Sequence, residues 1–161
     1  MNTAFLSLGS NLGNREAFLH QIIDIIEKHK IDILARSTII ETDPWGVKEV
    51  QEKYLNQVIK IRTSLYPFGL LNLLQEIEIQ LGRTHKGQLQ PRNADIDIIF
   101  FNDWSITSDR LCIPHLKFRE RLFVLAPLNE IEPEFIDPVS QQSIKSIYHQ
   151  CQLMAAQSKA L

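Results

Sequence analysis

The chain has 161 residues, a length that suits one domain built around one hydrophobic core. Its 44% hydrophobic and 22% charged residues are ordinary for a globular protein, and its net charge of -2 gives no support to binding of nucleic acid or an anionic membrane through bulk electrostatics. Two cysteines without Cys/His ligand spacing argue against a disulfide scaffold or a structural zinc site. No apolar run reaches the roughly 20 residues that a transmembrane helix needs. We therefore expect a cytoplasmic protein with residues 1–161 in a single domain.

The N-terminal stretch predicts a strand, a turn and a helix in quick succession. Residues 3–8 form a short apolar strand, and the turn Gly9-Ser10-Asn11-Leu12-Gly13-Asn14 follows it. Residues 15–30 place apolar side chains at helical spacing and therefore predict an amphipathic helix, for which Asn14 is a suitable N-cap. We interpret the two glycines as tight-turn residues, because the segment contains neither Gly-Lys-Ser/Thr nor the dinucleotide-binding fingerprint.

The middle of the chain predicts two more strands and a second helix. Residues 31–41 are rich in isoleucine and threonine, and residues 54–64 carry apolar side chains on both faces, so each segment predicts a strand. A helix over residues 67–82 begins at a proline, ends at a glycine and buries a leucine-rich stripe. Gln75 and Glu78 lie one turn apart on a different face of this helix.

The C-terminal third predicts shorter elements. Residues 104–107 and 111–113 suggest two short edge strands. Residues 117–126 predict a helix that Pro127 ends, because proline cannot donate a helical hydrogen bond. Apolar positions between residues 144 and 151 indicate a last amphipathic helix.

The order of the first six elements is strand, helix, strand, strand, helix, strand. This order is typical of ferredoxin-like α+β domains, in which helices pack on an antiparallel sheet. The segments after the fourth strand would form a C-terminal β/α extension, at the edge of the sheet or over its other face. We expect residues 153–161 to be a frayed tail.

The fourth strand, residues 95–101, contains two unexpected carboxylates. At period two its side chains divide between two faces, with Ile96, Ile98 and Phe100 on one and Asp95, Asp97 and Ile99 on the other. Neighbouring carboxylates in an apolar strand repel each other and lose hydration, so something must neutralise them. One interpretation is a solvated face where they pair with Arg92 or a lysine. The other is a divalent cation, because hard oxygen ligands suit magnesium and residues two apart on a strand lie only ~6.5 Å apart.

Polar and aromatic side chains near the ends of the predicted elements suit a nucleotide and a flat ring. Guanidinium forks match pairs of phosphate oxygens. The candidate side chains that would donate hydrogen bonds to phosphate are Arg83, Arg92, Arg110, His115, Lys117 and Arg121. The candidate ring contacts are Thr42, Trp45, Tyr54, Asn56 and Phe123. No serine or cysteine stands in a recognisable nucleophile context, so the set predicts metal-assisted transfer of a phosphoryl-type group. Arg110 and Lys117 are equally compatible with surface charges. His115 is also compatible with a structural role, and Phe123, on a helix, would by default belong to the core.

Several short motifs, in this order and spacing, resemble the 6-hydroxymethyl-7,8-dihydropterin pyrophosphokinases of folate biosynthesis. The most specific is Pro91-Arg92-Asn93-Ala94-Asp95-Ile96-Asp97-Ile98-Ile99, which matches that family's Pro-Arg-x-x-Asp-hydrophobic-Asp signature. The supporting motifs are Gly9-Ser10-Asn11-Leu12-Gly13, Tyr54-Leu55-Asn56, Glu78 with Gly82-Arg83, Pro114-His115 and Arg121-Leu122-Phe123. The resemblance covers nearly the whole chain, with Cys112 standing where some members have threonine.

The resemblance implies transfer of pyrophosphate from ATP to the hydroxymethyl group of 6-hydroxymethyl-7,8-dihydropterin, with release of AMP. It implies that Asp95 and Asp97 hold two magnesium ions and that Arg83 and Arg92 neutralise the transferring group. The implied pterin contacts are Thr42, Asp43, Trp45, Tyr54, Asn56 and Phe123. The implied ATP contacts are Gln75, Glu78, Arg92, Ile98, Arg110, Cys112, His115 and Arg121.

Two alternative functions stay open from the residues alone. One is a non-catalytic module that senses a pterin or a nucleotide, because a fold does not dictate a function. The other is a different Asp-x-Asp metal enzyme, such as a nucleotidyl or glycosyl transferase. For the leading interpretation we expect a monomer whose partners are ATP and the pterin, with no nucleic acid and no membrane.

Overall fold

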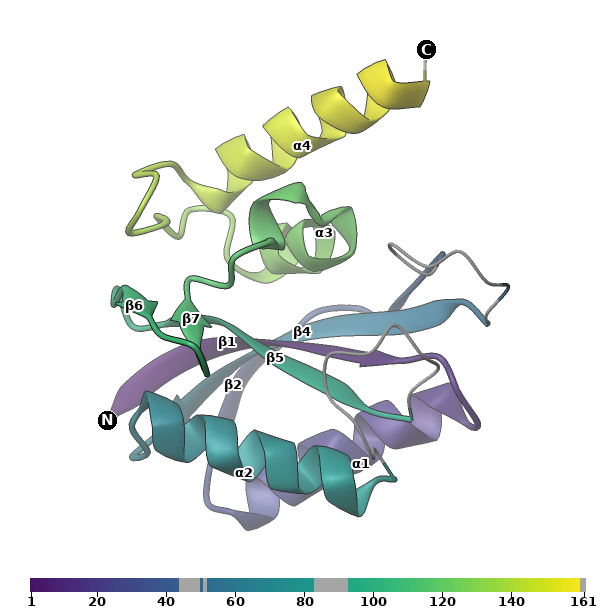
Figure 1. Cartoon of the computed structure of the whole chain (residues 1–161), viewed down its shortest axis with the longest axis vertical. Helices are drawn as coiled ribbons and strands as arrows, with labels where there is room; N and C mark the ends of the chain where they lie inside the picture. Colours follow the sequence, from purple (N-terminus) through teal and green to yellow (C-terminus); the bar gives the residue numbers. More distant parts are fainter. Residues whose placement is uncertain (44–49, 51, 83–92, 160–161) are drawn as a thin grey trace.

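An antiparallel sheet with helices on both faces forms the centre of the computed structural model, which describes residues 1–43, 50, 52–82 and 93–159. Helices α1 (Arg15–Lys28) and α2 (Pro67–Gln80) lie on one face, and α3 (Leu122–Ile131) and α4 (Ile144–Lys159) lie on the other (Figure 1). The expectation of an antiparallel sheet with packed helices is therefore confirmed. None of the helices in the described ranges has the length and apolar character of a transmembrane span.

Five strands make up the main sheet. They are β1 (Asn2–Ser10), β2 (Asp32–Arg36), β3 (Ile40–Thr42), β4 (Tyr54–Thr63) and β5 (Asp95–Phe101). The strand order is β2-β4-β1-β5, and β3 also pairs with β4. All of these pairs are antiparallel, and β5 occupies one edge of the sheet.

The single strand predicted over residues 31–41 is two strands, β2 and β3. Ser37 interrupts the ladder between them: its Oγ accepts the Val58 N–H at 2.9 Å, while its carbonyl accepts the Gln57 side-chain amide at 2.8 Å. A serine hydroxyl thus replaces a backbone acceptor, which is how serine competes with regular secondary structure.

The predicted division of β5 into two faces is correct as far as Ile99 and wrong at Phe100. The pairing with β1 shifts register between Phe5 and Leu6, so that Leu6 faces Ile98 and Phe5 faces Phe100. Ile99 is the extra residue of a β-bulge, which changes the alternation of side chains. Phe100 consequently packs with Phe5 on the α3 side of the sheet, rather than with Ile96 and Ile98 on the α2 side.

The helices begin largely where the sequence predicts. Asn14 caps α1 by accepting the Ala17 N–H at 3.1 Å, and α2 starts at a proline as expected. Two differences concern the C-terminal third. Residues Phe118–Glu120 form a short 3-10 helix, η1, and α3 starts only at Leu122 and runs through Pro127. Helix α3 keeps Pro127 because burial of its apolar side outweighs the one hydrogen bond that proline cannot donate.

The remaining elements complete the α3 side and the edge. Strands β6 (Ile106–Thr107) and β7 (Cys112–Ile113) form a separate two-stranded sheet, so the two predicted short strands exist but pair with each other. Helix α4 continues to Lys159, where the sequence predicted a frayed tail from residue 153.

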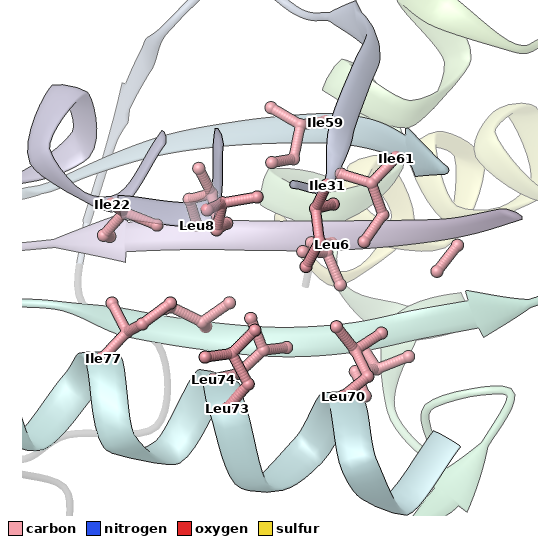
Figure 2. Close-up of a cluster of buried hydrophobic side chains, with 14 of the residues drawn as sticks. Leu6, Leu8, Ile22, Ile31, Ile59, Ile61, Leu70, Leu73, Leu74 and Ile77 are labelled. Atoms are coloured by element: carbon pink, nitrogen blue, oxygen red, sulfur yellow. The ribbon is translucent and has the colours of Figure 1, made fainter. Parts of the chain in front are cut away.

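Two hydrophobic clusters hold these layers together. In the first, leucine and isoleucine side chains of β1 and β4 pack with α1 and α2, as Figure 2 shows for Leu6, Leu8, Ile59, Leu74 and Ile77. In the second, phenylalanines of β1, β5, η1 and the α3–α4 connection pack edge to face or tilted, with ring centroids 4.7–6.1 Å apart. The second cluster fixes η1 and the start of α3 over the sheet face that carries the acidic pair.

Candidate active site

A row of residues crosses three strands on the α3 side of the sheet. Asn56 of β4 pairs with Gly9 of β1, and Gly9 pairs with Asp95 of β5, so Asn56 and Asp95 are two strand spacings, ~10 Å, apart. Asp97 follows two residues later on the same face, and both carboxylates are half-buried. The pterin side and the metal side of the expected site are therefore neighbours.

Gly9 lies in strand β1 and is not the tight-turn residue that the sequence suggested. A Cβ added to Gly9 would meet Asn56 Oδ1 and Tyr54 Cδ1, both at 3.4 Å. The missing side chain therefore leaves open the space between Asn56, Tyr54 and the acidic strand. Gly13, in contrast, has a φ of +68°, so its turn role is confirmed.

Strand β3 brings a further polar group to this row. Thr42 pairs with Tyr54, and the Asn56 side-chain amide donates a hydrogen bond to Thr42 Oγ1 at 2.6 Å. Asn56 is 4% exposed, so the partner that a polar residue inside a strand requires is present. Asp43 follows Thr42 directly and is exposed, with its carboxylate 3.8 Å from Lys53 Nζ.

The start of α3 supplies an aromatic ring and a cation. Phe123 is half-buried, and the Arg121 guanidinium lies over its ring at 5.5 Å from the centroid. Thr42 and Phe123 line a common cavity of about 650 Å³ between β3, α3 and α4. Four of the residues expected to contact the pterin thus come from β3, β4 and α3 on one side of the sheet: Thr42, Tyr54, Asn56 and Phe123.

A second cleft of about 350 Å³ lies at the outer edge of β5. Six residues predicted for the metal or the nucleotide are among those that line it: Asp97, Ile98, Arg110, Cys112, His115 and Arg121. Lys117 also lines this cleft and adds a third cation beside the two arginines. One acidic pair next to several cations is the charge distribution that a metal-bound polyphosphate requires.

The bulge at Ile99 helps to build this cleft. Its carbonyl accepts the His115 N–H at 3.0 Å, which attaches the segment after β7 to the edge of β5. The Lys117 N–H in turn donates to His115 Nδ1 at 3.2 Å, and this bond fixes the orientation of the imidazole. A backbone irregularity that no periodicity reveals therefore positions a predicted ATP contact.

Helix α2 contributes two residues that the sequence reasoning missed. Arg110 Nη2 donates to Asn72 Oδ1 at 2.6 Å, and the Arg110 guanidinium lies 5.9 Å from the centre of the Phe68 ring. Phe68 and Asn72 are one helical turn apart, so they hold the arginine from the same face of α2. Their separation of about 40 residues from Arg110 explains why local patterns could not find them.

The two other α2 residues expected at the nucleotide differ in their surroundings. Glu78 is only 1% exposed, although the sequence placed it away from the buried stripe, and its Oε1 accepts the Ile96 N–H at 3.4 Å. Gln75 is half-buried and, within the described part of the chain, is not among the residues that line the 350 Å³ cleft.

Trp45, Arg83 and Arg92 lie outside the described residues, so their expected roles stay predictions. Among the residues that are described, no group of three or more His, Cys, Asp or Glu side chains gathers into a complete metal site. The acidic pair would therefore supply only part of the ligands of a metal ion.

Comparison with known proteins decides the family. Residues 5–133 match the model of 7,8-dihydro-6-hydroxymethylpterin-pyrophosphokinase (HPPK). The chain belongs to the HPPK family. This confirms the expectation, drawn from the motifs, of a pyrophosphokinase of folate biosynthesis.

The chain is 47% identical over 131 residues to the 2-amino-4-hydroxy-6-hydroxymethyldihydropteridine pyrophosphokinase of Bacillus subtilis, covering 81% of this chain and 78% of that protein. It is 37% identical to the enzyme of the same name from Aquifex aeolicus, covering 90% and 89% of the two chains.

Solved HPPK structures share the fold. Plasmodium falciparum HPPK-DHPS with SDX-DHP matches 93% of this chain with a TM-score of 0.73 at 20% sequence identity. The chain spans only 43% of that larger protein. It likewise spans 38% of the bifunctional protein FolKE of Lactococcus lactis, to which it is 42% identical. The HPPK unit thus also occurs as one part of longer chains.

Proposed function

We propose that this protein transfers pyrophosphate from ATP to 6-hydroxymethyl-7,8-dihydropterin. In this reaction the pterin hydroxyl oxygen forms a bond to the β-phosphorus and loses its proton to solvent. The bond from that phosphorus to the oxygen that bridges it to the α-phosphorus breaks, and AMP leaves with that oxygen. The observation that supports the proposal is the row Asn56–Gly9–Asp95 beside the cleft that contains Asp97, because such an arrangement would hold a flat ring next to a polyphosphate. Both cysteines are free thiols, which supports the proposal of a reducing, cytoplasmic location. We also propose that the protein is a monomer.

The chemistry of the donor set fits magnesium held at Asp95 and Asp97. Magnesium binds through one or two carboxylates and takes its other ligands from substrate phosphates and water, so an incomplete acidic site is what it requires. When bound, the ions would neutralise charge on the phosphate oxygens. We propose two ions, as the HPPK family resemblance implies.

The residues of the chain divide the remaining work between two substrates. Tyr54 and Phe123 would stack on the pterin, while Asn56 and Thr42 read its polar edge. Arg110, His115 and Arg121 would bind the phosphates and ribose, and Ile98 would contact the base. Arg83 and Arg92 would neutralise the transferring group, and Trp45 would help to exclude water, which competes with the pterin as acceptor.

We also propose that the fold is ferredoxin-like with a C-terminal β/α extension. The order β2-β4-β1-β5, with α1 and α2 on one face, supports the first part, because it corresponds to a split β-α-β arrangement. The segment from β6 to α4 supports the second part, since it follows the last strand of the sheet.

The reaction is tested by incubating the protein with magnesium-ATP and 6-hydroxymethyl-7,8-dihydropterin and separating the nucleotide products. We expect AMP and the pterin diphosphate in equal amounts. ADP, or pyrophosphate with a nucleotidylated product, would indicate a different Asp-x-Asp transferase. Binding of both substrates with no product at all would indicate a ligand-sensing module.

Asn72→Ala is expected to weaken ATP binding without affecting the pterin. Loss of the 2.6 Å hydrogen bond releases Arg110, an exposed side chain, so the expected rise in KM for ATP is modest, roughly threefold to tenfold. Steady-state kinetics with each substrate varied in turn measure this effect. Gln80→Ala, an exposed change on the same helix, is the control, and an unchanged KM for ATP in Asn72→Ala would argue against the assigned role of Arg110.

A further inference from the structure

Two side-chain contacts join the C-terminal end of α2 to the start of β5. The Glu78 carboxylate accepts the Ile96 N–H at 3.4 Å, and the Asn93 side-chain amide donates to the Leu81 carbonyl at 2.9 Å. Both contacts bracket Asp95, and Ile96 separates Asp95 from Asp97 in the strand. The backbone that carries the acidic pair is therefore attached to the helix on both sides of Asp95.

Glu78 makes its contact at the open edge of the sheet. Strand β5 is the edge strand, and an edge presents backbone N–H groups that need acceptors from elsewhere. Glutamate is almost never fully buried unless it is paired, and Glu78 is only 1% exposed, so its carboxylate needs hydrogen-bond partners such as the Ile96 N–H of β5. Packing alone would favour an apolar residue at this position of α2.

Gly82 shows that the Asn93 contact is specifically accommodated. This glycine has a φ of +101°, and a Cβ at that position would lie 2.8 Å from Asn93 Nδ2. Any other residue would be strained in the backbone and would collide with the asparagine amide. The end of α2 therefore leaves space for the side chain that connects it to β5.

We propose that Glu78 and Asn93 are positioning residues that hold Asp95 and Asp97 in the geometry that binds the metal. Glu78 acts through the Ile96 N–H and Asn93 acts through the end of α2, so neither needs to touch the metal or the nucleotide. This inference rests on the proposed function, in which the acidic pair carries the magnesium ions. Residues that orient metal ligands typically change metal affinity or activity 10- to 100-fold when they are mutated.

Glu78→Ala, Glu78→Gln and Asn93→Ala test the proposal. In Glu78→Ala we expect roughly tenfold weaker binding of Mn²⁺ in the presence of α,β-methylene-ATP, and a similar loss in kcat with little change in KM for the pterin. Hydrogen exchange at the Ile96 amide should become faster. Glu78→Gln retains an acceptor oxygen and should restore each property to within about threefold of wild type, because the hydrogen bond and not the charge positions the strand. Asn93→Ala should produce a smaller loss in Mn²⁺ affinity.

Glu76→Ala is the matched control, because Glu76 is exposed on the same helix two residues away. If Glu78→Ala lowers thermal stability but keeps Mn²⁺ affinity and kcat, the residue has only a structural role and the proposal is wrong. If Glu78→Ala does not fold, the proposal is tested with Glu78→Gln and Asn93→Ala. Unchanged Mn²⁺ affinity in Asn93→Ala would overturn the proposal, and so would a Glu78→Gln protein that binds Mn²⁺ much more weakly than wild type. Failure of the proposed function has a different signature, since Asp97→Ala would then bind Mn²⁺ and nucleotide as well as wild type.

Discussion

Replacing Asp97 with alanine is expected to lower kcat for AMP formation roughly 10³-fold or more. Stabilisation of transition-state charge by a bound metal is worth several kcal/mol, and each 1.36 kcal/mol corresponds to about a factor of ten. Asp97 pairs with Ser7 of β1 and lines the 350 Å³ cleft, a position from which its carboxylate would hold a metal ion that also binds the phosphates. Asp95→Ala should have an effect of the same order, since the two carboxylates would act on the same ions.

Quenched-flow or steady-state detection of AMP measures this loss, and circular dichroism with thermal melting shows whether the variant is folded. Asp103→Ala is the control, because Asp103 is an exposed aspartate in the turn after β5 and its replacement removes the same charge outside the site. A folded Asp97→Ala protein with a near-native rate would exclude the metal-binding role. The first interpretation of the pair, two solvated acids neutralised by neighbouring cations, would then be the better one.

Local patterns predicted the elements and the acidic strand. The N-cap Asn14 and the proline at the start of α2 were visible because each satisfies the local chemistry of a helix terminus. Asp95 and Asp97 were visible because charged residues are rare in an otherwise apolar strand. The motifs around them identified the HPPK family because the function constrains residue types at fixed spacing.

The differences arise where contacts between distant segments override the local pattern. The bulge at Ile99 depends on the pairing of β5 with β1, so the alternation of side chains alone could not show that Phe100 faces α3. Glu78 lies off the leucine-rich stripe of its helix, so the helical pattern did not predict its burial, and its acceptor role depends on a strand residue 18 positions later. Gly9 looked like a turn residue because its neighbours are turn-formers, whereas the pairing of β1 continues through Ser10.

The contact between η1 and the α3–α4 connection is another feature that the sequence did not reveal. Asp137 is 0% exposed, and its Oδ2 accepts from Arg119 Nε and from Ser140 Oγ, each at 2.7 Å, while Oδ1 accepts the Val139 N–H at 3.1 Å. Burial raises the pKa of Asp137, but the hydrogen bonds from Ser140, Val139 and Arg119, together with the charge of Arg119, outweigh it and lower the pKa below its usual value. The Arg119 guanidinium also lies over the Phe118 ring, 4.5 Å from its centroid, so the ion pair of Arg119 with Asp137 connects the α3–α4 segment to the second hydrophobic cluster.

Asp137→Ala is therefore expected to lower the free energy of unfolding by about 3 kcal/mol, because it leaves the partly buried Arg119 guanidinium and two further hydrogen-bond donors without the fully buried carboxylate that accepts from them. Urea denaturation measures this change. Asp32→Ala is the control: its pair with Arg62 has a similar distance of 2.8 Å but is about half exposed on both sides, so its loss should cost less than about 1 kcal/mol. A cost for Asp137→Ala as small as that for Asp32→Ala would show that water replaces the lost carboxylate.

The same replacement should also change how stability depends on pH. Because the folded pKa of Asp137 lies below the unfolded value of about 3.9, its contribution is complete above that value and is lost as the pH falls through the folded pKa. The difference in unfolding free energy between wild type and Asp137→Ala should therefore be constant near neutral pH and should shrink in acid. Urea titrations at a series of pH values measure this difference. A difference that stays constant as the pH falls would mean that the carboxyl is not held in its ionised form, and the buried ion pair would not be what stabilises the η1 contact.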